Sequence, residues 1–167
     1  MDINSRIEQA KKDILSDDWK VQNQASNLLS ENSSVEIREF LISLLNSIRP
    51  DVRNVAALTI RDIKDDDAVI SLFAAIFKKE NYGTTGTFVY ALQTLNCSKY
   101  LKELFQIIFH YNYEPQVLAG HILEEQQFIY TKEDIAGIVE GWNKVKENKK
   151  GDERVFIQDI VDRFSQF

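Results

Sequence analysis

A helical pattern of apolar residues recurs along this sequence at intervals of 30 to 34 residues, and its first copy is the weakest. Within each copy, the residues follow the i, i+3, i+4, i+7 spacing of a helix that buries one face. The five sets are Ile7, Ala10, Lys11 and Ile14; Ile37, Phe40, Leu41 and Leu44; Val69, Leu72, Phe73 and Ile76; Leu101, Leu104, Phe105 and Ile108; and Ile135, Ile138, Val139 and Trp142. A period of this length is typical of stacked helical hairpins, in which each hairpin buries its apolar face only against its neighbours.

A second series lies between these helices and places a small residue four positions before a large one. The pairs are Ala25 and Leu29, Ala56 and Ile60, Ala91 and Leu95, and Ala119 and Leu123, with Ile157 and Val161 in the same place of the last copy. Because a small side chain lets two helices approach closely, this series predicts the second helix of each hairpin, and Gly120 fits the same requirement. We expect ten helices in one domain over residues 1–167, paired as hairpins 3–31, 34–64, 67–97, 99–126 and 132–166.

The most distinctive copy of the repeat is residues 50–63. Pro50 stands in the first helical turn, where its missing N–H is tolerated. Asp51 follows near the positive end of the helix dipole, and Arg53 is placed to reach an acidic neighbour in an adjoining hairpin. The last copy repeats this pair as Asp152 and Arg154.

This pattern of proline, Asp-x-Arg, Ala-Ala and then Leu or Ile resembles the HEAT repeat. The resemblance implies an all-α fold, an α/α superhelix or solenoid, in which the second helices of the hairpins line an inner, concave surface. The alternative is an irregular all-α bundle.

Charge and composition limit the classes of ligand. The net charge of −6 argues against direct binding of nucleic acid, because phosphate contacts need clustered Lys and Arg. The longest unbroken apolar run, residues 72–77, is far shorter than the roughly 20 residues of a membrane helix. A single cysteine, Cys97, suits a reducing cytosol. We therefore expect a cytoplasmic protein that binds neither nucleic acid nor a membrane and favours a basic protein partner. The oligomeric state is open, with a monomer favoured.

The sequence contains no phosphate-binding loop, dinucleotide-binding turn, nucleophile elbow or zinc signature. His121, Glu124 and Glu125 have the i, i+3, i+4 spacing that could hold a divalent metal, although a solvated polar face has the same spacing and is the interpretation we prefer. HEAT-like folds include DNA glycosylases, but these need a basic concave surface. We therefore predict no cofactor and no catalytic activity.

Two regions stand out as candidate binding surfaces. Residues 81–98 carry no charge, and the expected helix there offers polar and aromatic side chains that suit a face covered by a partner; burial by neighbouring hairpins is the alternative. The outward positions of the second helices become acidic toward the C-terminus. The predicted partner-binding residues are Asp62, Tyr90, Gln93, His121, Glu124, Glu125, Asp159 and Asp162.

Together these features predict a non-catalytic module that binds one basic protein. More loosely, the chain resembles the small acidic immunity proteins of bacterial contact-dependent growth inhibition systems in its size, acidity and helical repeats. That resemblance implies neutralisation of a cognate toxin domain, a nuclease, by covering its active site or its substrate groove. The alternative function is a HEAT-repeat scaffold or adaptor for a larger assembly.

Overall fold

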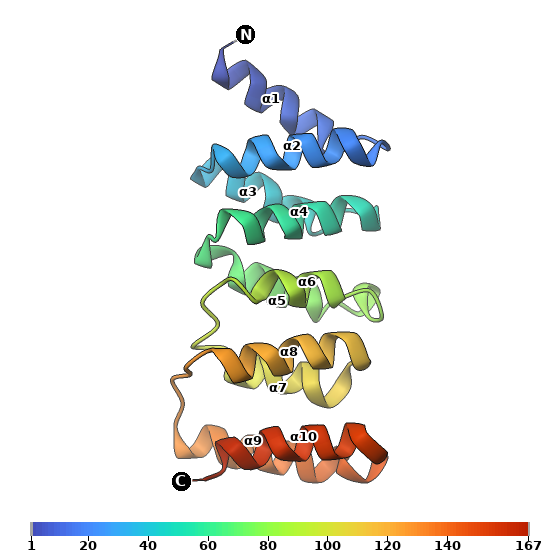
Figure 1. The fold of residues 1–167 in the computed structure, drawn as a ribbon, viewed down its shortest axis with the longest axis vertical. Coiled ribbons are helices and arrows are strands. Elements are labelled where there is room, and N and C mark those ends of the chain that lie inside the picture. Colours follow the sequence, from blue (N-terminus) through green and yellow to red (C-terminus); the bar gives the residue numbers. More distant parts are fainter. Residues whose placement is uncertain (1, 167) are drawn as a thin grey trace. The chain divides into compact units, whose positions relative to one another are not determined.

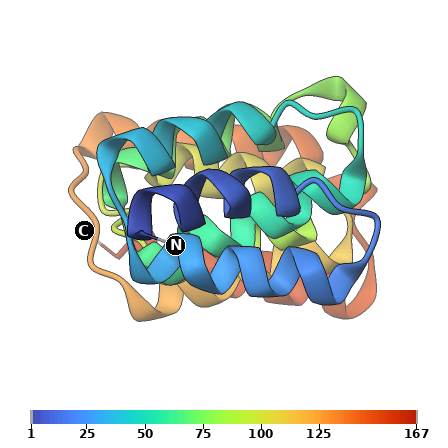
Figure 2. The same cartoon turned by 90° about the horizontal axis from the view of Figure 1, so that it is seen from above.

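The computed structural model describes residues 2–166, which form helices joined by short connections and contain no strand (Figures 1 and 2). The α-helices are α1 (Ile3–Asp13), α2 (Trp19–Glu31), α3 (Val35–Leu44), α4 (Pro50–Ile63), α5 (Val69–Ile76), α6 (Gly86–Leu92), α7 (Leu101–His110), α8 (Tyr113–Glu125), α9 (Lys132–Val145) and α10 (Gly151–Phe164). The 3-10 helices are η1 (Asp66–Ala68), η2 (Lys79–Asn81) and η3 (Lys146–Asn148). Each expected hairpin contains two consecutive α-helices, so the all-α class and the ten helices are confirmed within this range.

The chain divides into two compact units, Met1–Leu95 and Asn96–Phe167. The first unit holds the hairpins α1–α2, α3–α4 and α5–α6, and the second holds α7–α8 and α9–α10. A single continuous superhelix over residues 1–167 stays a prediction.

Within the first unit, the second helices of the hairpins pack side by side, α2 on α4 and α4 on α6. The alanines that the sequence assigned to this contact, Ala25, Ala56 and Ala91, are all buried. Between α2 and α4 the hydroxyls of Ser26 and Thr59 lie 2.7 Å apart in the buried contact. Thr59 also donates to the carbonyl of Val55 (2.7 Å), so Ser26 is the donor to Thr59.

The second unit is built around a cluster of aromatic rings. Phe109 of α7 stacks on Trp142 of α9 with ring centroids 5.9 Å apart, and Phe105 meets the edge of Phe164 at 5.5 Å. Trp142 is only 2% exposed, as its place in the core register predicted. The side chain of Phe156 of α10 packs against Gly120 of α8, where a Cβ atom would lie 2.6 Å from Cζ of Phe156. A larger side chain at this position would therefore force Phe156 to shift.

All residues of the small–large series are buried, although Leu95 lies beyond the end of α6. The first helices of the hairpins agree less uniformly with the predicted pattern of buried apolar residues. Half-buried positions among them include Ile7 and Phe40 in the first unit and Ile135 and Val139 in the second. The register is therefore complete in α5 and α7, where all four of its positions are buried, and partial in α1, α3 and α9.

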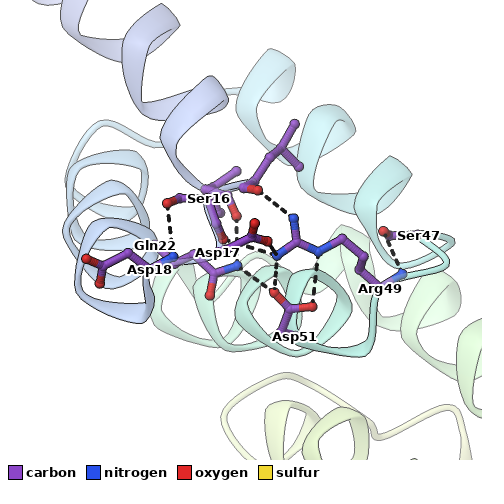
Figure 3. Close-up of polar contacts among 9 residues, drawn as sticks. Ser16, Asp17, Asp18, Gln22, Ser47, Arg49 and Asp51 are labelled. Carbon is purple, nitrogen blue, oxygen red and sulfur yellow. Dashed lines mark hydrogen bonds and ion pairs between the residues drawn. The ribbon is translucent and has the colours of Figure 1, made fainter.

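The Asp-x-Arg motif of α4 works differently from the prediction. Asp51 lies in the first turn of the helix as expected, but its ion pair is with Arg49, the N-cap residue, at 2.5 Å (Figure 3). Arg53 was predicted to reach an acidic neighbour, and instead its guanidinium donates to the carbonyl of Ser47 at 2.7 Å. The guanidinium of Arg49 also reaches the preceding hairpin, where it donates to the carbonyl of Leu15 (2.8 Å).

None of the helices between residues 2 and 166 is both long enough and apolar enough to cross a membrane.

Candidate functional site

The acidic residues predicted near the C-terminus gather on α8 and α10 of the second unit. These helices pack through Gly120 against Phe156, and their C-terminal ends are joined by an ion pair between Arg163 and Glu124 at 3.3 Å. His121, which is exposed, shares a helix face with Glu124 because it lies three residues earlier. We call the exposed residues His121, Glu124, Glu125, Asp159, Asp162 and Arg163 the acidic surface.

The acidic surface carries more negative than positive charges. Four carboxylates face a single guanidinium in this set, so the surface is net negative even with the Glu124–Arg163 pair in place. Sequence spacing did not predict that pair, because its partners stand 39 residues apart and meet only through helix packing. The pair leaves Glu125 and Asp159 as the carboxylates most available to a partner.

A residue that the sequence analysis missed positions one of these carboxylates. Gln158 donates to the carboxylate of Asp162 at 2.7 Å and accepts a hydrogen bond from the indole nitrogen of the buried Trp142 at 2.6 Å. The core of the second unit therefore fixes the orientation of a surface carboxylate. The i, i+4 spacing of Gln158 and Asp162 on one helix face was the available signal.

Two further ion pairs bear on the electrostatics of the second unit. Lys102 of α7 binds Asp134 at 2.5 Å, and with the hydrogen bonds from Thr131 it lowers the pKa of Asp134 to about 2. Lys149 binds Glu153 at 2.7 Å and lowers the pKa of that carboxyl, with a smaller contribution from the amide of Gln116. These carboxylates stabilise the fold and are distinct from the acidic surface.

The other predicted residues, Asp62, Tyr90 and Gln93, belong to the first unit. The guanidinium of Arg61 lies 4.5 Å from the ring centroid of Tyr90 and 3.1 Å from the carboxylate of Asp62. Arg61 therefore brings Asp62 and Tyr90 together and offsets the negative charge. The hydroxyl of Thr94 donates to the carbonyl of Arg61 at 3.1 Å and ties the end of α6 to α4.

The helix predicted in the uncharged segment 81–98, which is α6 in the structure, is shorter and more buried than expected. It was predicted to continue to Cys97, but α6 ends at Leu92, and the chain turns at Gln93. Five of its seven residues are buried, and the 39% exposed Tyr90 is its most exposed large apolar side chain. Burial, the alternative considered for this helix, accounts for most of its uncharged composition. Tyr90 and the half-buried Gln93 remain accessible to a partner.

The possible metal ligands do not converge. Across residues 2–166 no three His, Cys, Asp or Glu side chains are grouped so that they could hold a metal ion. His121, Glu124 and Glu125 are all exposed, and Glu124 is engaged by Arg163. The spacing of these residues describes a solvated helix face.

No family model matches the sequence, and no curated protein shows significant similarity to it.

Proposed function

We propose that the chain is a non-catalytic protein-binding module whose acidic surface binds a basic protein. The observation that carries this proposal is the contact between Glu124 and Arg163, which joins α8 to α10 and places carboxylates from both helices on one surface. A rigid surface with excess negative charge favours a positively charged partner and speeds its association.

In its most concrete form, the proposal is an immunity protein that neutralises a toxin domain with a basic substrate groove, such as a nuclease, in the cytoplasm. The support is the net charge of −6 and the small helical chain. A nuclease must present cations to bind its phosphate substrate, so a protein that covers this groove needs carboxylates in return.

The test reverses two carboxylates on the acidic surface, Glu125→Lys together with Asp159→Lys. Both residues are exposed, and neither replacement removes the Glu124–Arg163 pair. The matched control is Glu31→Lys with Glu39→Lys, which changes the net charge equally at exposed positions of the first unit. Surface changes of this kind usually alter stability by no more than about 0.5 kcal/mol.

The measurement is co-precipitation from the source cell, followed by growth of cells that express the captured partner. We expect the parent and the control to capture one stoichiometric basic protein and to protect the cells, and the variant to do neither. Association with the purified partner should slow as salt rises, since the Debye length falls from about 10 Å at 0.1 M to about 3 Å at 1 M. Equal capture and protection by variant and control would contradict the proposal.

A further inference from the structure

The connections inside the three hairpins of the first unit lie along one side of that unit (Figures 1 and 2). With the first residues of the helices that follow, they comprise residues 15–20, which run into the first turn of α2, residues 46–51, which run into the first turn of α4, and residues 77–82 after α5. We call these three segments the loop edge. It is separate from the acidic surface, which belongs to the second unit.

The loop edge exposes large apolar side chains on each of its three segments. Their exposed fractions are 44% for Leu15, 67% for Trp19, 95% for Ile48, 37% for Phe77 and 60% for Tyr82. Single exposed apolar residues are common on protein surfaces, but several large ones on neighbouring segments, with aromatic rings among them, favour an interaction site.

Polar contacts hold the three segments in fixed register. Arg49 in the middle segment donates to the carbonyls of Leu15 (2.8 Å) and Ser16 (3.2 Å) in the first segment. Lys78 in the third segment donates to the side chain of Asn46 in the middle one. Figure 3 shows the Arg49 side of this arrangement, where the guanidinium also binds Asp17 (2.8 Å). The edge is therefore organised before any partner binds, which lowers the entropic cost of association.

The charges of the loop edge are antisymmetric about its middle segment. The charged residues are Asp17, Asp18 and Lys20 in the first segment, Arg49 and Asp51 in the middle, and Lys78, Lys79 and Glu80 in the third. The first segment is thus net negative, the middle neutral and the third net positive. A surface with this arrangement is complementary to a copy of itself turned by a two-fold rotation.

We propose that the loop edge is the interface of a homodimer, with the two-fold axis passing near Ile48. In this arrangement the negative first segment of one copy meets the positive third segment of the other, and Trp19 lies against the partner's Tyr82. Such an isologous contact closes on itself and gives a dimer, not a chain of copies. The mutual burial of the apolar residues supplies the driving force, and the charges set the orientation. A dimer differs from the monomer favoured in the sequence analysis.

Two charge reversals test the orientation as well as the association. Asp17→Lys makes both outer segments positive, and Lys79→Glu makes both negative, so each variant alone places like charges together twice in a dimer. Both positions are exposed, and Arg49 keeps its contact with Asp51 when Asp17 is changed.

Sedimentation velocity over a wide concentration range is the measurement. We expect the parent to sediment as a dimer, each variant alone as a monomer, and an equimolar mixture of the two variants as a dimer, because each lysine at position 17 then meets a glutamate at position 79. A monomeric parent at every concentration overturns the proposal, as do dimeric single variants or a mixture that stays monomeric.

A second pair of variants tests the apolar centre. Ile48→Asp places two carboxylates together at the axis and should weaken the dimer by at least about tenfold. Ile70→Asp, at a 64% exposed isoleucine of α5 outside the edge, is the control and should leave the dimer intact. Equal behaviour of the two variants would overturn the placement of the interface. Because these measurements need no other protein, their outcome is independent of the acidic surface.

Discussion

The side-chain amide of Gln116 in α8 donates a hydrogen bond to the carboxylate of Glu153 in α10 across 3.0 Å. The same nitrogen donates to the carbonyl of Ile108 at 2.9 Å. Gln116 is only 2% exposed. Its side chain therefore supplies a hydrogen-bond donor to a carbonyl in the last turn of α7 and links α7 and α8 to α10, the second helix of the next hairpin.

Gln22 makes the corresponding contacts in the first unit. Its amide donates to the carbonyl of Ile14 at 3.2 Å and to the carboxylate of Asp51 at 3.1 Å. Both glutamines stand eight residues after the carbonyl that they satisfy. Each unit thus joins two hairpins with a buried glutamine and an acidic residue from the first turn of the following second helix.

We expect Gln116→Met to lower the free energy of unfolding by about 1 to 3 kcal/mol, because it keeps the side-chain volume but leaves buried polar groups without their donor. Urea unfolding measures the change. Gln106→Met, at an exposed position of α7, is the control and should stay within about 0.5 kcal/mol. A loss of stability no larger than that of the control would show that the hydrogen bonds of Gln116 contribute little to the free energy of unfolding.

The ion pair of Asp134 predicts how stability changes in acid. Because its folded pKa of about 2 lies below the ordinary value of 3.8, the pair contributes fully above pH 4 and is lost as the pH falls through about 2. Asp134→Asn removes the charge while its side-chain oxygen can still cap the helix. We expect this variant to lose less stability than the parent between pH 4 and pH 2, measured by urea unfolding at each pH.

Glu133→Gln, an exposed neighbour in the same helical turn, is the control for this experiment and should retain the parent's acid dependence. If Asp134→Asn lost stability in acid as steeply as the parent, another group would be responsible.

Two glycines in the second unit separate helix propensity from packing. Gly137→Ala adds a Cβ atom that meets nothing within 4 Å and should stabilise α9 by about 0.5 to 1 kcal/mol. Gly120→Ala should gain less or destabilise, because its Cβ atom would lie 2.6 Å from Phe156. Thermal unfolding compares the two, and adding Phe156→Leu should improve the Gly120→Ala variant more than the parent. Equal gains at both glycines would contradict the contact between Gly120 and the side chain of Phe156.

The hydroxyl pair between α2 and α4 should show energetic coupling. Thr59→Val removes the acceptor of the buried Ser26 hydroxyl, whereas Ser26→Ala leaves Thr59 bonded to the carbonyl of Val55. We expect Thr59→Val to cost more, on the order of 1 kcal/mol, and the double variant to cost less than the sum. Additive changes in a double-mutant cycle would show that the two hydroxyls do not interact in solution.

Local sequence rules located the helices well because the relevant interactions are local. Pro50 in the first turn and the apolar period between residues 35 and 63 placed α3 and α4 closely. The end of α6 was misplaced. Leu95 continues the register of the small–large series, but the backbone N–H of Cys97 donates to the side chain of Gln126 at 2.8 Å, a contact that no local pattern contains.

The sequence by itself determined the number of helices, their buried faces and the small residues where second helices meet, since period and side-chain volume act between neighbours in the chain. Only the tertiary structure decided the long-range polar partners: Arg49 reaches the carbonyl of Leu15, 34 residues earlier, and Arg163 reaches Glu124, 39 residues earlier. The physical reason is the length of these side chains. A long charged side chain can bind any suitable group that helix packing brings within a few ångströms of it, and spacing along the chain does not predict which group that is.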